Sequence, residues 1–339
     1  MKFQQVAALV FLAAFTPSAH ADQLKYIKLP DQALAAFTAM ANHSKRSIDL
    51  TTFIFEPCHA STQVMMEILA KRSKAGVRVR LLLDEITQSG SEKKNLAAWA
   101  VLNGIELRWY HNPLIPNPGQ NHRSHAKFMV VDNDSYISGG RNIADEYFGM
   151  YDGPNFVDRD VIVKGASARQ ATASFEELWN AQLTGEPRGH SKFLPWAASC
   201  GKDESKRVAA VKKFLGRAQP ILKAIPQRSC KRVNFLTDAP DFLNSRYDGP
   251  RDRGTTTDYM SELRMRRKRV TKAMLSMIRG TRKRFDAENW SYMPHYEMRR
   301  ALRELRDRRI PVNVITNEDM DGPGIIKHAE EFVNNHYAQ

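Results

Sequence analysis

Apolar positions between residues 30 and 110 alternate between a helical and a strand-like spacing. The helical spacing predicts helices over Pro30–Ser44, Ser61–Ala75 and the stretch that contains Leu96–Leu102. Short runs of branched apolar residues predict strands over Ile48–Phe55, Val77–Leu83 and Ile105–Tyr110. Helices that alternate with strands indicate a layered α/β domain with a mixed sheet.

The next stretch of the chain combines strand signals with reactive side chains. Its sequence is NHRSHAKFMVVDNDSYISGGRNIADEYFG, and Phe128–Val131 has the apolar character of a buried strand. His125 and Lys127 stand two residues apart, a spacing that places side chains on one face of a strand. A second short strand, Tyr136–Ser138, leads into a glycine pair and Asn142.

These residue types suit a bound phosphate. An imidazole is a nucleophile or proton carrier, an ammonium neutralises charge, and the amide of Asn142 is a hydrogen-bond donor. Gly139 and Gly140 allow backbone to approach a ligand closely. Each residue alone is more often a surface or structural one. Because these five residues and Asp132 keep a fixed spacing across a strand and a turn, we interpret the set of six as a phosphate site.

The spacing H-x-K, four residues, D, six residues, G-G-x-N resembles the HKD motif of the phospholipase D superfamily. GGRNIADEYFG resembles the first motif of the bacterial cardiolipin synthase branch. The resemblance implies a phospholipase D-like mixed sheet flanked by helices. It also implies a mechanism in which His125 attacks phosphorus while Lys127 and Asn142 hold the non-bridging oxygens. Asp132 is the acidic member of the motif, with a supporting role. Many members carry Ser at the position of Gly140, so a hydroxyl contact to phosphate is absent here.

A second acidic residue follows the motif. Phe156–Val163 is predicted as a strand with Asp158 and Asp160 on one face, and Ser167–Asn180 as a helix. In the family, an aspartate seven residues before a glycine such as Gly165 sits behind the catalytic histidine. Asp158 matches it and would fix the imidazole tautomer and stabilise its charged form. The alternative is an exposed acid on an edge strand.

The C-terminal part repeats the beginning of the predicted domain. RRIPVNVITNE, from Arg308 to Glu318, aligns without a gap on AGVRVRLLLDE, from Ala75 to Glu85, and Phe285–Tyr292 echoes the strand at Ile48. The same offset applied to His125 falls beyond Gln339. We therefore expect four parts: a signal peptide (1–21), a phospholipase D-like domain with the HKD motif (22–185), an irregular connecting region (186–255) and a partial second domain lacking the motif (256–339).

A single motif leaves the second histidine of a two-motif mechanism unaccounted for. Three explanations stay open: the sequence is a truncated product, two copies of His125 face one another in a homodimer, or another residue is the acid. A basic amphipathic helix over Thr257–Arg279 either lies on an anionic membrane or packs on its own domain.

Composition adds location and charge. Lys2, the apolar run Val6–Phe15 and Ala19-His20-Ala21 have the form of a cleavable signal, which predicts a periplasmic or secreted protein. The net charge of +14 favours an anionic partner, a phospholipid surface or a nucleic acid.

Cys200 and Cys230 are a candidate disulfide, with Cys58 left over. Metal-ligand spacing is absent from the sequence, so neither a metal nor another cofactor is expected.

We therefore expect a phosphodiesterase or phosphatidyltransferase that acts on phospholipids through a phosphohistidine. Two alternatives stay open. One is a secreted single-motif endonuclease of the same superfamily, and the other is a phosphate-binding module without turnover.

Overall fold

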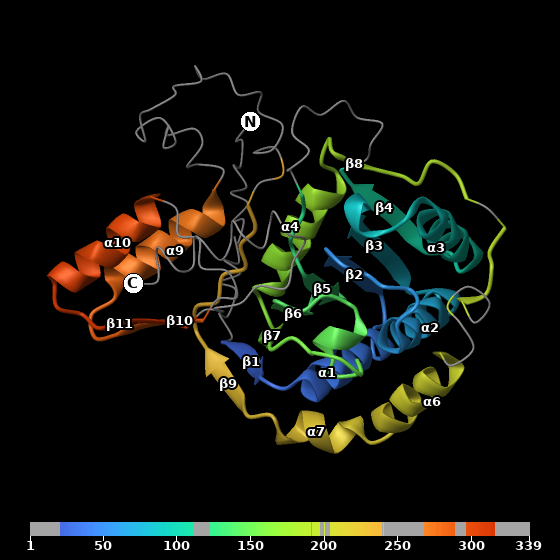
Figure 1. The fold of residues 1–339 in the computed structure, drawn as a ribbon, viewed down its shortest axis with the longest axis horizontal. Coiled ribbons are helices and arrows are strands. Elements are labelled where there is room, and N and C mark those ends of the chain that lie inside the picture. The colour runs from blue at the N-terminus through green and yellow to red at the C-terminus, as the bar shows by residue number, and fades with distance from the viewer. Residues whose placement is uncertain are drawn as a thin grey trace, which may run out of the picture. The chain divides into compact units, whose positions relative to one another are not determined.

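The computed structural model describes residues 21–111, 123–190, 192–196, 200, 204–238, 240, 268–288 and 296–315 (Figure 1). Almost all of the predicted signal peptide and most of the Pro-rich loop before the motif lie outside these residues. The chain divides into two compact units. Within the described residues, the first unit comprises 21–110, 124–175 and 186–235. The second comprises the remaining described segments, chiefly 268–288 and 296–315.

The first unit is built on a mixed β-sheet. Its strands are β1 (Asp22–Ile27), β2 (Ser47–Thr52), β3 (Arg78–Asp84), β4 (Glu106–Tyr110), β5 (Phe128–Val131), β6 (Ser135–Gly139), β7 (Asp160–Lys164) and β9 (Gln227–Cys230). Neighbouring strands follow the order β4-β3-β2-β5-β6-β7-β1-β9. The pairs among β2, β3 and β4 are parallel, and all other pairs in this order are antiparallel. The predicted α/β architecture with a mixed sheet is confirmed.

Helices cover both faces of this sheet (Figure 1). One face carries the helices α1 (Pro30–Asn42), α2 (Ala60–Lys74) and α3 (Gly90–Leu102). Their apolar side chains form one core with inward residues such as Ile48 and Leu50. The opposite face packs on α4 (Ala168–Trp179), where the rings of Phe128 and Phe175 meet edge to face with centroids 6.4 Å apart. Parallel strands need crossover helices, which explains why α2 and α3 lie between β2, β3 and β4.

The predicted strand over Phe156–Val163 is wrong in its first half. β7 begins only at Asp160, because both of its neighbours stop there: Gly139 is the last residue of β6 to pair, and Ile27 the last of β1. The backbone N–H of Phe156 donates instead to Glu146 O at 2.9 Å. The strand β1 was not predicted from the sequence at all.

The expectation of an irregular connecting region is also wrong in part. Residues 204–230 form the helices α6 (Glu204–Leu215) and α7 (Ala218–Ala224) and the edge strand β9. Val208, Val211 and Ile225 are buried in the core of the first unit. These apolar residues are few among polar residues and prolines, so the sequence did not indicate the helices α6 and α7 or the strand β9.

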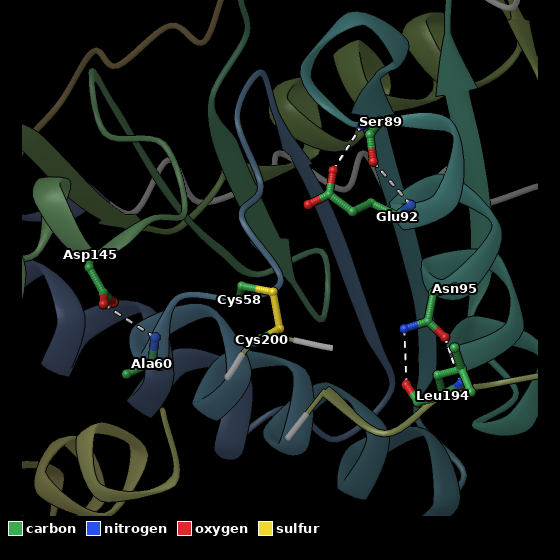
Figure 2. Close-up of a disulfide and its surroundings, with 8 residues drawn as sticks. All are labelled: Cys58, Ala60, Ser89, Glu92, Asn95, Asp145, Leu194 and Cys200. Atoms are coloured by element: carbon green, nitrogen blue, oxygen red, sulfur yellow. Dashed lines mark hydrogen bonds between the residues drawn. A yellow bond between two sulfur atoms is a disulfide. The ribbon is translucent and has the colours of Figure 1, made fainter. Parts of the chain in front are cut away.

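The cysteine pairing differs from the candidate pair Cys200–Cys230. Cys58 and Cys200 form the disulfide, with Cα atoms 5.0 Å apart (Figure 2), while Cys230 is a free thiol. Linear spacing carries no information on pairing, because the fold decides which cysteines meet. The disulfide fastens the loop after β2 to the segment that follows Leu194, whose backbone is bound by the side chain of Asn95.

The second unit contains α9 (Arg269–Gly280), β10 (Phe285–Glu288), α10 (Tyr296–Asp307) and β11 (Val312–Ile315), and the short strand β8 (Thr184–Gly185) is also grouped with it. β10 and β11 pair in parallel, as β2 and β3 do. The described residues thus contain a strand-helix-strand segment, β10-α10-β11, over the stretch that carries the sequence repeat. Leu275 and Ile278 of α9 are buried with Ala301 and Leu305 of α10. These residues of the basic helix pack on their own unit, and its predicted beginning lies outside the described residues.

None of the helices in the described part of the chain is long and apolar enough to cross a bilayer.

Candidate active site

The register of the sheet brings the motif residues to one edge. Thr51 near the end of β2 pairs with Phe128 at the start of β5, and Phe128 pairs in turn with Ser138 of β6. Gly139, the next residue, pairs with Asp160 at the start of β7. The residues before β5, after β6 and before β7 therefore meet at the edge where β2 ends.

The aromatic ring of Phe53 connects the two charged residues of the motif. Phe53 follows β2 directly, and its ring centroid lies 4.9 Å from that of His125, at an interplanar angle of 62°. Nζ of Lys127 lies 5.5 Å from the same ring centroid. The imidazole and the ammonium thus border one aromatic side chain. Sequence reasoning missed Phe53, which lay inside the predicted strand Ile48–Phe55, whereas β2 ends at Thr52.

Lys127 is a buried cation that is hydrogen-bonded to backbone. The side chain donates from Nζ to His125 O at 3.0 Å, and the residue is 7% exposed. Its own carbonyl accepts from Gly139 N at 3.4 Å, so the glycine turn lies beside it. Burial lowers the pKa of Lys127 to about 8, and the charge of Asp158 opposes the shift. At pH 7 the ammonium is therefore still mostly charged.

His125 is held in its neutral form. Burial by surrounding protein atoms, with the positive charge of Lys127, lowers the pKa of His125 to about 4. A neutral imidazole has a free nitrogen lone pair at pH 7, which a nucleophile requires. The residue nevertheless keeps exposed surface, so a substrate can reach it.

Asn142 is oriented by the loop that carries Phe53. Its Oδ1 accepts from Ile54 N at 2.9 Å and from Thr52 Oγ1 at 3.2 Å, and the residue is 2% exposed. These donors identify the oxygen of the amide, so the NH₂ group is left to donate elsewhere. The side chain of Tyr147 hydrogen bonds with that of Asn142. Burial raises the pKa of the Tyr147 hydroxyl, and this hydrogen bond lowers it by a smaller amount. The amide is thus fixed before a ligand arrives.

Gly139 and Gly140 are packed closely against the segment 158–160 of the same chain. A Cβ at Gly139 would lie 2.2 Å from Arg159 O and 2.7 Å from the Cα of Asp160, and one at Gly140 only 1.9 Å from Asp158 Oδ1. The predicted reason for the glycines, close approach of a ligand, is therefore incomplete. At Gly140 the space that a serine side chain needs is filled by the carboxylate of Asp158.

Asp158 lies against Gly140 and acts electrostatically on Lys127. Burial and the charge of Lys127 are the causes that lower the pKa of His125, and Asp158 is not among these causes. The role of Asp158 as the partner of the imidazole therefore stays a prediction. Its place beside the lysine is the geometry that the structure adds.

A buried ion pair that sequence reasoning did not single out supports the turn. The side chain of Arg141 is fully buried, and its Nη1 lies 2.5 Å from Asp160 Oδ2. Its Nε donates to Tyr147 O at 2.9 Å. Arg141 therefore joins the glycine turn to the start of β7 and to the short 3₁₀ helix η2 (Asp145–Tyr147).

Asp145 connects the same 3₁₀ helix to α2. Its carboxylate accepts from Ala60 N at 3.3 Å (Figure 2) and from Ser61 N at 2.8 Å. These hydrogen bonds satisfy free N–H groups in the first turn of α2. The contact fixes the position of Tyr147 relative to the loop after β2. Nothing in the spacing of ADEYFG predicted this long-range cap.

The structure does not bring Asp132 together with the other motif residues, so its place among the catalytic residues is not supported. Asp132 follows β5, whereas His125 and Lys127 precede it. Its carboxylate accepts from the backbone N–H groups of Lys45, Arg46 and Ser47 at 2.6–3.1 Å. Although burial acts the other way, these hydrogen bonds hold the pKa of Asp132 below its ordinary value. Asp132 supports the fold by anchoring the start of β2.

Two surface cavities in the described part of the chain lie elsewhere. One of about 350 Å³ lies between α1, α2, α6 and α7, and another of about 750 Å³ adjoins Asp132. His125, Lys127 and Asn142 line neither of these two cavities. The described residues also include no cluster of three or more His, Cys, Asp or Glu side chains that could hold a metal.

Comparison with known proteins finds similar sequences over the part of the chain that contains the motif. Residues 37–179 match the family model described as "Cardiolipin synthase, PLD-like domain". Cardiolipin synthase C of Escherichia coli is 31% identical over 163 residues, which is 44% of this chain and 34% of that protein. An uncharacterised protein of Helicobacter pylori is 33% identical over 148 residues, 40% of this chain and 29% of the relative. The chain thus spans about a third of the length of these curated relatives.

A solved structure extends the likeness in fold. The phosphatidylserine synthase of Haemophilus influenzae aligns with a TM-score of 0.54 and 9% sequence identity. The alignment covers 87% of this chain and 61% of that one. At this identity the likeness concerns the fold alone.

Proposed function

We propose that this chain, whose residues 37–179 belong to the phospholipase D superfamily near its cardiolipin synthase branch, cleaves or transfers phosphodiesters of phospholipids through a phosphohistidine at His125. One observation carries the proposal. The neutral imidazole of His125 and the ammonium of Lys127 border the same ring of Phe53, and the loop of that ring orients Asn142.

The first step follows from these groups. A nitrogen of His125 attacks phosphorus, a P–N bond forms, and the ester P–O bond to the leaving alcohol breaks. Negative charge grows on the non-bridging oxygens, where Lys127 and the NH₂ group of Asn142 stabilise it. The leaving oxygen takes up a proton from a general acid, which we assign to none of the described residues.

The second step decides the type of enzyme. Water or an alcohol attacks the phosphohistidine, its own proton is taken by a base, and the P–N bond breaks to restore His125. Water as the acceptor gives a phospholipase, and the glycerol hydroxyl of phosphatidylglycerol gives a cardiolipin synthase. The similarity to cardiolipin synthase C supports a lipid substrate over a nucleic acid.

Location and assembly are further parts of the proposal. The predicted signal over residues 1–21 would export the protein to the periplasm or beyond. A homodimer in which two copies of His125 face one phosphate would supply a second imidazole as the acid. Light scattering of the purified protein, with and without substrate, tests that arrangement.

The substrate class is tested with two labelled substrates in parallel. Purified protein is incubated in EDTA with labelled phosphatidylglycerol vesicles and with supercoiled plasmid. We expect phosphatidic acid or cardiolipin from the lipid and intact plasmid. Nicked plasmid without lipid turnover would indicate the nuclease alternative, and no turnover of either would indicate a binding module.

A matched pair of variants assigns the activity to the motif. His125→Ala should lower turnover by at least about a thousandfold, as loss of a covalent nucleophile does. His43→Ala is the control, because His43 also precedes a lysine by two residues in H-x-K order. The ring of His43 hydrogen bonds with the carbonyl of Ala39 near the end of α1, away from the candidate site, so this variant should keep full activity. Activity that survives His125→Ala would remove the assignment of the nucleophile.

A further inference from the structure

A group of exposed apolar side chains lies beside the candidate active site, and we call it the apolar rim: Leu29, Tyr151, Phe156 and Val157. Their exposed fractions are 53%, 47%, 42% and 73%. Isolated exposed apolar residues are ordinary, but a contiguous group marks an interaction surface.

Strand pairing and local contacts place the rim residues at the same end of the sheet. Leu29 follows the last paired residue of β1, Ile27, and Val157 precedes Asp160, the residue that pairs with Ile27. A Cβ built on Gly149 would lie 3.2 Å from Cγ of Pro30, so the loop that leads to Tyr151 lies against the start of α1. The rim therefore occupies the same sheet edge as the glycine turn.

The loop that carries most of the rim is ordered by its own contacts. The side chain of Asn155 accepts from Tyr151 N and donates to Tyr151 O at 3.0 Å, which closes a compact turn. The ring of Phe156 lies against that of Tyr147, with centroids 4.8 Å apart. Because Tyr147 contacts Asn142, the exposed loop is fixed relative to the phosphate-binding amide.

The chemistry of the rim selects its partner. Residues 151–157, YDGPNFV, include aromatic and aliphatic side chains and one acid, Asp152, but neither Lys nor Arg. A nucleic-acid surface beside a phosphate site would carry cations, which neutralise the neighbouring phosphates. A phospholipid presents its phosphate at the level of the headgroups and apolar chains just below. Aromatic and aliphatic side chains enter that boundary, and the net charge of +14 favours an anionic bilayer.

We propose that the apolar rim docks the protein on an anionic phospholipid bilayer and presents headgroup phosphates to Lys127 and Asn142. This inference rests on the proposed lipid chemistry and names the surface that delivers the substrate. The rim enters the boundary between headgroups and acyl chains, while the sheet edge faces the membrane.

Sedimentation of the full chain with phosphatidylglycerol vesicles tests the proposal, with phosphatidylcholine vesicles as the uncharged comparison. The double variant Tyr151→Ser, Val157→Ser should bind anionic vesicles about tenfold more weakly than the parent, because it loses apolar area from the interface. Val157→Trp should bind more tightly, since Trp favours the membrane interface. Thermal melting of each variant confirms that it is folded.

The matched control is Val101→Ser, Leu102→Ser at the end of α3. These side chains are 62% and 64% exposed, but they precede β4 and so lie at the opposite edge of the parallel strands. This control should bind vesicles as the parent does. Equal losses in both double variants, or no loss in the rim variant, would overturn the proposal. So would a rim variant that binds vesicles normally but loses binding to plasmid DNA.

All binding measurements are made in the His125→Ala background, so that they do not depend on turnover. Turnover is measured separately on monomeric short-chain phosphatidylglycerol with the intact His125. Rim-dependent binding without any turnover would leave the docking surface standing and reject the proposed chemistry. Turnover of the monomeric lipid without rim-dependent binding would support the proposed chemistry and reject the docking surface.

Discussion

The ring of Phe53 packs on the imidazole of His125, with centroids 4.9 Å apart. Phe53 follows β2 and His125 precedes β5, so the contact joins two segments that are distant in the chain. The ring covers one side of the imidazole that the proposed chemistry needs in its neutral form. Phe53 is therefore a positioning residue, since it acts on phosphate only through His125 and Lys127.

Replacement of Phe53 by Ala should raise the pKa of His125 from about 4 toward its ordinary value of 6.5, because burial is the main cause of the lowered value. In the native protein this folded pKa lies below the unfolded one. The unfolded state therefore binds the proton more readily, and stability falls as the pH drops from about 6.5 to about 4. The variant should lose this part of the pH dependence. Histidine NMR titration measures the pKa, with His125→Ala to identify the signal; an unchanged pKa would contradict the role of the ring.

Gly139 and Gly140 should respond differently to Ala. At Gly139 the new Cβ meets backbone, which moves only with the strand pair, so the free energy of unfolding should fall by about 3 kcal/mol, the upper end for overpacking. At Gly140 it meets the Asp158 carboxylate, which can rotate away, so the loss should be about 1 kcal/mol.

Displacing Asp158 removes a negative charge that raises the pKa of Lys127. The alkaline limb of the activity profile, expected near pH 8, should therefore move to lower pH in Gly140→Ala. Urea unfolding and a pH profile of kcat/KM measure the two effects. Equal destabilisation at both glycines would show that the close contacts do not set their roles.

Asp132→Ala should destabilise the fold without altering the pKa of His125. The carboxylate binds three backbone N–H groups at the start of β2, much as a helix cap does, and its loss should cost about 1–2 kcal/mol. Because the folded pKa is lowered, this stability is present above the unfolded pKa and is lost as the pH falls through the folded value. Denaturant unfolding at pH 7 and at acidic pH measures both.

Asp134→Ala is the control for Asp132. Asp134 is 54% exposed and pairs with Lys164 at 3.5 Å, so its removal should change stability by less than about 0.5 kcal/mol. A shifted His125 pKa in Asp132→Ala would indicate that Asp132 belongs to the site after all.

The motif could be predicted from the sequence because its signals are local. The bounds Phe128–Val131 of β5 agree with the prediction. His125 and Lys127 lie in the segment before β5 and not, as was predicted, on one face of a strand, and they meet through the ring of Phe53. Phe53 could not be predicted, because its contact depends on the antiparallel pairing of β2 with β5. The same holds for Asn142, whose orientation is set by Thr52 and Ile54.

Tertiary pairing explains the other differences. Asp132 has the spacing of the motif, but the strand β5 separates it from His125. Spacing along the chain does not show that the two side chains lie at opposite ends of that strand. The helices α6 and α7 and the strand β9 have mostly polar sequences. Their few apolar residues could not be predicted as core residues, because only the fold shows that they pack on the core of the first unit. Cys58 meets Cys200 across 142 residues, a distance at which sequence alone does not select partners.

Loss of the Cys58–Cys200 disulfide should lower the free energy of unfolding by about 2–4 kcal/mol, because the closed loop restricts the unfolded chain. Cys58→Ser, Cys200→Ser tests this by denaturant unfolding, with Cys230→Ser as the neutral control. Peptide mapping without reductant should recover the linked pair. A link from Cys230 to either residue would contradict the arrangement in Figure 2.

The central claim is that His125 carries the phosphoryl group, and trapping of the covalent intermediate tests it most directly. Protein is mixed with phosphatidylglycerol labelled at its phosphate, quenched in alkali and digested, and the labelled peptide is sequenced by mass spectrometry. We predict label on the peptide that contains His125, its loss in His125→Ala and its retention in His43→Ala. Lipid turnover in His125→Ala, or label on another residue, would contradict the account.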